Sequence, residues 1–189
     1  MAVPEGTYEL GPDDGRLLIR TGRSGLGRRA GHDLTIEATR WTAAVTVREP
    51  PEESSVEVDV EVDGLEVREG TGGVKPLTDQ DRADIVRNLR TVLDARRHPR
   101  ITFRSTAVAV GGGGRAAGGE HDVEGDLAIL GVVKPVRVQA VFDGGRVRGG
   151  AAVRQSRWGI KPYSAFFGAL RLADDVEVAF DLGFPAGGA

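Results

Sequence analysis

The most constraining feature of this sequence is a stretch in which valine and acidic residues alternate, from Ser54 to Val62. Valine occupies every second position from Val56 onwards, and glutamate or aspartate occupies the positions between. A period of two with β-branched side chains is typical of a β-strand that buries one face and exposes the other. After Gly64 the apolar positions become Leu65 and Val67, so the alternation shifts by one residue. We therefore expect a β-bulge at Gly64 that bends the strand.

The same alternation predicts strands along most of the chain. A second shift by one residue falls in the middle of a long stretch, His32–Val47. Asp143-Gly144-Gly145 is a strong signal for a hairpin turn, and Leu130-Gly131-Val132 indicates another tight reversal. Gly111–Gly119 is typical of a hairpin loop. With Ser54–Val62, the predicted strands number eight, the others being Arg16–Thr21, His32–Val47, Arg100–Val110, Glu120–Leu130, Val133–Asp143, Arg146–Trp158 and Asp174–Leu182.

One segment follows a helical period instead. Between Thr78 and Asp94 the apolar residues recur at intervals of three and four, which places them on one stripe of a helix. Thr78 and Asp81 have the spacing of a capping box, so we expect a helix at about 79–94, between the third and fourth strands. A single helix cannot cover a sheet of eight strands on both sides. It must plug or flank a structure that the strands build themselves.

These elements predict one all-β domain over residues 1–189. Eight strands joined mostly by short turns favour an antiparallel, up-and-down, lipocalin-like barrel, with a Greek-key sandwich as the competing fold. An eight-stranded barrel has a bore that side chains can fill or that can hold one small ligand. The inward candidates are mostly small aliphatic residues, and aromatic residues make up only 5% of the chain. This composition favours a cavity over a solid core.

Composition excludes several classes of function. The chain has no cysteine, so disulfides, thiolate metal sites and cysteine nucleophiles are absent. Its net charge of −3 gives no basic field for nucleic acid. The three histidines lack metal-ligand spacing, and His32-Asp33 and His121-Asp122 are strand neighbours that point to opposite faces. We therefore expect no enzyme, no catalytic residue, no metal and no cofactor. Without a leader or a membrane span, a cytoplasmic location is expected.

Three ordered stretches carry a resemblance to a known family. The first is the run from His98 to Thr106, H-P-R-I-T-F-R-S-T. The second runs from Val123 to Val136 as V-x-G-x-L-x-x-x-G-V-V-K-P-V, and the third combines W-G-I-K-P from Trp158 with L-x-D-D-V-E-V from Leu172. Together with the opening G-T-Y-E-L-G, these stretches resemble the YceI-like family of polyisoprenoid-binding proteins over nearly the whole chain. The resemblance implies a lipocalin-like barrel and a noncovalently held isoprenoid or other amphiphilic lipid, and proteins of this family often form homodimers.

Two further stretches are similar to a subgroup of that family. The segment from Ala30 to Leu34 has the form A-G-H-D-L, and a later segment has the form K-P-Y-S-A. Neither stretch names a ligand. The expected partner is therefore an isoprenoid or fatty-acid-like small molecule, with no nucleic acid and no membrane span, and with a homodimer possible.

The candidate ligand-binding residues fall into two groups. One group consists of apolar positions expected to face the bore, where each buried methylene is worth about 0.8 kcal/mol. The other is the aromatic-rich loop 158–171, which is either a lid over one barrel end or a hydrophobic plug or dimer contact. The members of both groups are Ile19, Val58, Val60, Phe103, Val138, Trp158, Tyr163, Phe166, Phe167 and Phe180.

A polar head group would remain at the mouth of the barrel, where arginine can bind an anion. The first predicted hairpin is rich in arginine and glycine, so it is either an anion clamp or an exposed basic hairpin. The candidate head-group contacts are Arg20, Arg28, Arg29, His32 and Lys161. Two other functions remain open. The loop 158–170 could serve a protein–protein interaction module, or an enzyme could act on a bound lipid.

Overall fold

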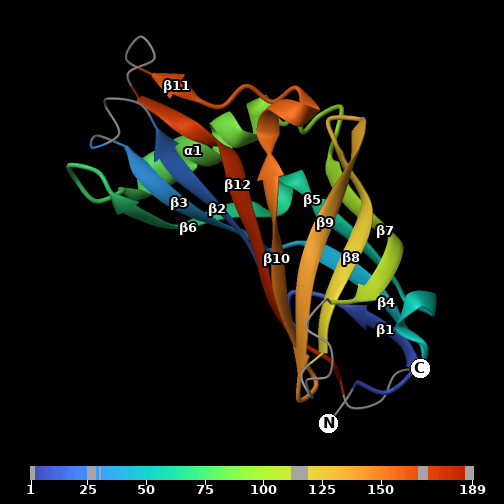
Figure 1. Ribbon diagram of the computed structural model, residues 1–189. Coiled ribbons are helices and arrows are strands. Elements are labelled where there is room, and N and C mark those ends of the chain that lie inside the picture. Colours follow the sequence, from blue (N-terminus) through green and yellow to red (C-terminus); the bar gives the residue numbers. More distant parts are fainter. Residues whose placement is uncertain (1–2, 25–28, 30, 112–118, 166–169, 186–189) are drawn as a thin grey trace.

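In a computed structural model, the chain forms a curled antiparallel sheet with one α-helix at its upper end (Figure 1). The structure describes residues 3–24, 29, 31–111, 119–165 and 170–185. The helix is α1 (Asp79–Val92). The strands of the described residues are β1 (Gly6–Leu10), β2 (Gly15–Ser24), β3 (His32–Ala38), β4 (Trp41–Val47), β5 (Ser55–Glu61), β6 (Leu65–Gly72), β7 (Arg100–Val110), β8 (Gly119–Ile129), β9 (Val132–Asp143), β10 (Arg146–Arg154), β11 (Ser164–Ala165) and β12 (Leu170–Gly183).

The prediction of eight strands is wrong, because the described residues form twelve. Two long predicted strands are each divided. His32–Val47 becomes β3 and β4, and the stretch around Ser54–Val67 becomes β5 and β6. β1 was missed because it is short and carries only two buried residues, Tyr8 and Leu10. The two-residue strand β11 has too few residues to show any period.

The expected bulge at Gly64 is also wrong, since a 3-10 turn (Val62–Gly64) separates β5 from β6. This turn lies opposite the break between β3 and β4, since Ala38 pairs with Leu65 and Trp41 with Val60. The backbone N–H and the side-chain hydroxyl of Thr39 both donate to the Gly64 carbonyl, each at 2.8 Å. A Cβ atom at Gly64 would lie 2.7 Å from the Cβ of Arg40, so a larger residue would force the two bends apart. Both shifts in the alternation therefore have one origin, a bend that two paired antiparallel strands share.

The strands follow one another around the curled sheet in the order β1-β4-β5-β7-β8-β9-β10-β12-β2-β3-β6, with β11 paired to β12. All the pairings are antiparallel, and from β7 to β10 they connect neighbours in sequence. β12 pairs with β2, so the C-terminal strand lies beside an N-terminal one, with Val178 opposite Ile19. A single curled sheet of this kind supports the barrel-like arrangement rather than the sandwich.

The helix α1 begins at a complete capping box, as the sequence predicts. Thr78 accepts a hydrogen bond from the Asp81 backbone N–H, and the Asp81 carboxylate accepts one from the Thr78 backbone. Leu89 and Leu93 turn toward the core. Arg90 pairs with Asp63 at 3.0 Å, which ties the helix to the turn between β5 and β6. No helix among the described residues is long and apolar enough to span a bilayer.

Candidate ligand-binding cavity

The curled sheet encloses a cavity of about 710 Å³. Every described strand except β11 contributes to its wall, and Leu89 of α1 and Leu93, which directly follows the helix, contribute at the upper end. Most of the lining residues are Val, Leu, Ile, Ala and Phe. This volume lies within the range of small-molecule sites in proteins. The wall is therefore suited to an apolar ligand.

The strand register explains why these residues face the same interior. Residues directly opposite on neighbouring antiparallel strands share one face of the sheet. On one side of the cavity Ala43, Val58, Phe103 and Leu127 stand opposite one another across β4, β5, β7 and β8. On the other side the corresponding row is Ile36, Ile19, Val178 and Ala151 across β3, β2, β12 and β10. The period of two in the sequence thus becomes a continuous apolar lining.

Two aromatic rings in this lining lie against glycines of the neighbouring strand. A Cβ atom at Gly125 would lie 2.4 Å from Cζ of Phe103. A Cβ atom at Gly149 would lie 2.6 Å from Cζ of Phe180. Each ring therefore occupies the space that a side chain would otherwise take. Both rings therefore form part of the cavity wall.

The two ends of the cavity differ. At the end near α1 the lining residues Leu93 and Ile160 are buried, at 8% and 6% exposure. At the opposite end the cavity is lined by residues that are themselves exposed, namely Arg48, Glu49, Asp143 and Gly144. Since these are the exposed lining residues in the described part of the chain and the others are buried or half-buried, we identify that end as the mouth. It lies between the end of β4 and the turn from β9 to β10.

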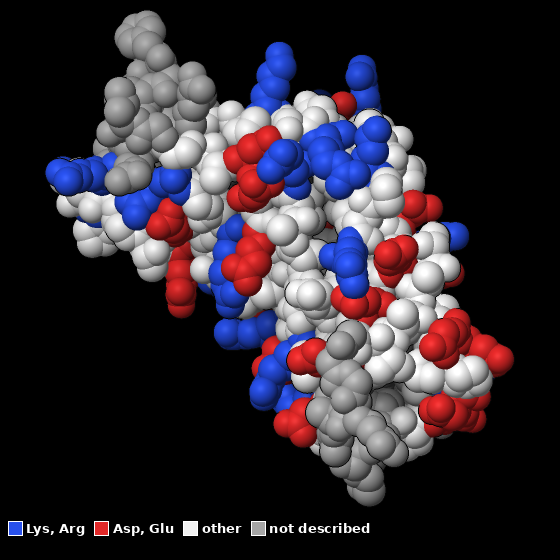
Figure 2. Space-filling view, viewed as in Figure 1, with Lys and Arg blue, Asp and Glu red and all other residues white. Residues whose placement is uncertain are grey.

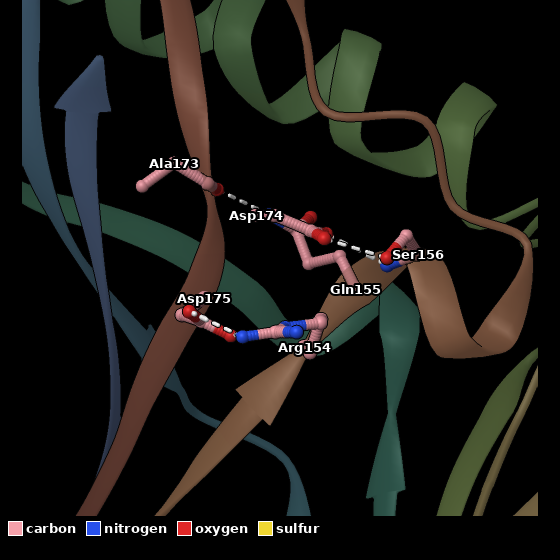
Figure 3. A network of polar contacts seen from close by, with 6 residues as sticks. All are labelled: Arg154, Gln155, Ser156, Ala173, Asp174 and Asp175. Atoms are coloured by element: carbon pink, nitrogen blue, oxygen red, sulfur yellow. Dashed lines mark hydrogen bonds and ion pairs between the residues drawn. The ribbon is translucent and has the colours of Figure 1, made fainter.

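A network of polar contacts holds the closed end together (Figure 3). The Ser156 backbone and hydroxyl donate to Asp174 at 2.8 and 2.5 Å, and Gln155 donates to the Ala173 carbonyl at 3.1 Å. The two hydrogen bonds from Ser156 lower the pKa of Asp174. These contacts join the 3-10 turn Gln155–Trp158 to the irregular part of β12, between Leu172 and Val176. Gln155 lines the cavity, so the network fixes the shape of its inner end.

The structure distributes the predicted apolar contacts between wall and core. Six of them line the cavity, namely Ile19, Val58, Val60, Phe103, Val138 and Phe180. Trp158 does not line it: the side chain is 1% exposed, and its Nε1–H donates to the Leu127 carbonyl at 2.9 Å. Tyr163 is 48% exposed and also lies off the cavity wall. Phe166 and Phe167 lie outside the described residues.

None of the described head-group candidates lines the cavity. Arg20 pairs with Glu177 on the exposed outer face, and Arg29 and Lys161 are exposed. His32 contacts the Lys75 carbonyl at 2.7 Å through Nε2. Arg28 lies outside the described residues. The C-terminal end of β2 and the N-terminal end of β3 lie near α1, away from the mouth (Figure 1).

In the hairpin formed by β2 and β3, Arg23 makes a bidentate contact with Asp33, in which its Nε and Nη2 donate to the two carboxylate oxygens, each at 2.9 Å. This hydrogen bonding lowers the pKa of Asp33. The contact joins β2 to β3 and keeps the Asp33 carboxylate charged. It gives the arginine a structural role in the hairpin.

Sequence reasoning missed the polar residues of the mouth. His121 lines the cavity two residues inside the start of β8, where its ring contacts Phe142 with centroids 5.2 Å apart. His121 has the same parity along β8 as Val123, so the alternation could have identified it. Arg48, Glu49 and Asp143 follow strand ends, where the period of two gives no information. Among the described residues, no group of three His, Asp or Glu side chains could hold a metal ion.

Comparison with protein-family models matches residues 19–184 to the YceI-like domain. The fold is similar to that of BcnA from Burkholderia cenocepacia, with a TM-score of 0.62 and 17% identity over 89% of this chain and 94% of that one. A polyisoprenoid-binding domain from Saccharophagus degradans, implicated in plant cell wall breakdown, gives a TM-score of 0.59 and 11% identity over 97% and 100%. A search among curated proteins gave no match.

Proposed function

This chain belongs to the YceI-like domain family, and we propose that it binds a long apolar or amphiphilic molecule in its cavity without catalysing a reaction on it. The observation that carries the proposal is the 710 Å³ space with an aliphatic and aromatic wall. The similar domain from Saccharophagus degradans is described as polyisoprenoid-binding. An isoprenoid or fatty-acid-like chain suits the same kind of space.

The energetics require the ligand to have a long apolar part. Each buried methylene contributes about 0.8 kcal/mol. Association costs roughly 4–15 kcal/mol in lost translational and rotational freedom. About twelve methylenes are therefore needed before burial offsets a cost in the middle of that range. A small polar metabolite has no comparable source of affinity in this wall.

The placement of titratable groups favours binding over catalysis. The titratable side chains that line the cavity are Arg48, Glu49, His121 and Asp143, all toward the mouth. From there to α1 the described lining is apolar except for a few side chains such as Thr21, Gln155 and Trp41. General acid–base chemistry on a buried ligand requires a positioned titratable group near the reacting atoms. The inner wall offers none among the described residues, so carriage or storage is the better proposal.

The test is to extract the purified protein with organic solvent and to identify the released molecules by mass spectrometry. Native mass spectrometry of the same sample gives the stoichiometry. We expect one long-chain molecule per cavity, and, if the protein purifies empty, uptake of added dodecanol. Protein that contains no such molecule and takes up no dodecanol would overturn the proposal.

A matched pair of variants on β9 locates the bound molecule. Val138 lines the cavity, whereas Val141 on the same strand is 42% exposed. Val138→Glu places a carboxylate in the apolar wall and is expected to abolish ligand retention, because an ionised group is costly to bury. Val141→Glu places the same group on the outer face and should retain the ligand. Equal retention by the two variants would place the ligand elsewhere.

A further inference from the structure

The mouth of the cavity carries an excess of carboxylates among the described residues. Glu49 and Asp143 line it, and the 3-10 turn Pro51–Glu53 beside it adds Glu52 and Glu53. Glu5 accepts a hydrogen bond from the Glu49 backbone N–H at 2.7 Å, which places a fifth carboxylate at this end. Figure 2 shows acidic side chains (red) gathered at the end of the molecule where Figure 1 places β1 and β4.

These carboxylates lack cationic partners in the described part of the chain. The ion pairs formed there include none of the five, although sixteen such pairs occur elsewhere. Arg48 lines the same mouth and donates to its own neighbour, the Val47 carbonyl, at 2.9 Å. Arg146 and Arg148 follow the β9–β10 turn, but both pair with Asp181 on the outer face. Among the described residues, the mouth therefore presents five carboxylates without an ion-pair partner, beside Arg48 and a cluster of Arg146, Arg148 and Asp181 whose net charge is +1.

A bound amphiphile has one favourable orientation in this cavity. Its apolar end gains most by lying at the closed end against Leu93 and Ile160, which are buried and apolar. Its polar end avoids the cost of burial only by remaining at the mouth. The head group thus lies in the field of the five carboxylates, which attracts a cation, tolerates a neutral group and repels an anion.

We propose that the cavity selects amphiphiles whose head group is uncharged or cationic, such as an alcohol or an ammonium, and discriminates against phosphate and carboxylate heads. The inference rests on the proposed function. It reverses the expectation that an arginine clamp at the mouth binds an anion. The basic β2–β3 hairpin lies at the other end of the molecule, so its charge does not act on the head group at close range.

Three probes with the same chain test the proposal: dodecylamine, dodecanol and dodecanoate, each below its aggregation concentration. Calorimetry at low ionic strength is expected to give affinities in the order amine, alcohol, carboxylate, with about a tenfold gap between the first and last. In the double variant Glu49→Gln with Asp143→Asn, the ratio of the affinity for dodecylamine to that for dodecanoate should fall severalfold. Added salt should narrow it in the wild type.

A charge-matched double variant is the control. Glu124→Gln with Asp126→Asn removes two exposed carboxylates from the outer face of β8, away from the mouth. It should leave the gap unchanged. Equal or tighter binding of dodecanoate in the wild type, or an unchanged gap in the mouth variant, would overturn the head-group selection while leaving the cavity intact. Failure of dodecanol itself to bind would overturn the proposed function and this inference together.

Discussion

Replacing Trp158 by phenylalanine separates the packed aromatic residues of this protein from those that face the cavity. The indole is 1% exposed, and its Nε1–H donates to the Leu127 carbonyl at 2.9 Å. Loss of a buried hydrogen bond whose acceptor stays behind costs about 1–3 kcal/mol. The smaller ring leaves a void that adds about 1 kcal/mol. We therefore expect Trp158→Phe to lower the free energy of unfolding by roughly 2–4 kcal/mol.

Urea and thermal unfolding followed by circular dichroism measure this loss. For a chain of this size, each kcal/mol corresponds to roughly 2–4 °C, so the melting temperature should fall by roughly 5–15 °C. Ligand affinity should stay within about twofold of the wild type, because the indole lies off the cavity wall. Trp41 lines the cavity and remains as the fluorescent reporter of binding.

Phe103→Leu is the matched comparison, because this ring faces the cavity. Part of its surface already borders empty space, so shortening it should cost only about 1 kcal/mol of stability. It should change the affinity for dodecanol more than Trp158→Phe does. An unchanged unfolding free energy in Trp158→Phe, together with lost binding, would refute the reasoning and return the indole to the ligand site.

Three further predictions concern the cavity wall, the shared bend at Gly64 and the carboxyl groups with lowered pKa values. Lengthening a saturated alcohol by one methylene should tighten binding about fourfold until the chain outgrows the cavity, which calorimetry on a homologous series would show; a flat series would indicate surface binding. Gly64→Ala should lower the free energy of unfolding by about 1–3 kcal/mol in urea titrations, because its Cβ would press on Arg40, whereas Gly11→Ala, with only ordinary contact at 3.6 Å, should cost less. Hydrogen bonds from Arg137, Ser156 and Arg146 are the main cause of the lowered pKa values of the carboxyls of Asp122, Asp174 and Asp181, respectively. The contribution of these carboxyls to stability is therefore present above the unfolded pKa of 3.8, and it is lost as the pH falls through their lower pKa values in the folded protein. The free energy of unfolding should therefore fall as the pH is lowered across this range, and it should fall less steeply in the Asp174→Asn variant.

The wall of the cavity could be predicted from the sequence because its signal is local. A period of two assigns each residue to a face without knowledge of its neighbours, and six positions chosen this way line the cavity. The division of the long strands could not be predicted in the same way. It depends on a hydrogen bond from Thr39 to Gly64, residues that are far apart in the chain. The shifts in the alternation marked the places but not their cause.

The ends of the cavity were harder to predict than its wall. The sequence shows that the segment after Trp158 is aromatic, but only packing shows that its indole faces the core instead of a ligand. The arginines of the first hairpin suggested a clamp at the mouth. Which end is open depends on where α1 lies, and the side chain stripe of a helix does not give its position on the sheet. The charge of the mouth therefore had to come from the structure.

The pairing of β12 with β2 has a consequence for how the protein is made. Arg20 and Glu177 meet across these strands although 157 residues separate them in the chain. Contacts between such distant segments form late and slowly, because the entropy of closing a long loop is lost before the contacts begin to stabilise the chain. During synthesis the strands from β2 to β10 emerge before β12, which pairs with both β10 and β2 and so links the two parts of the sheet. The nascent chain therefore has no enclosed space, and an apolar cargo can be taken up only once translation has delivered β12.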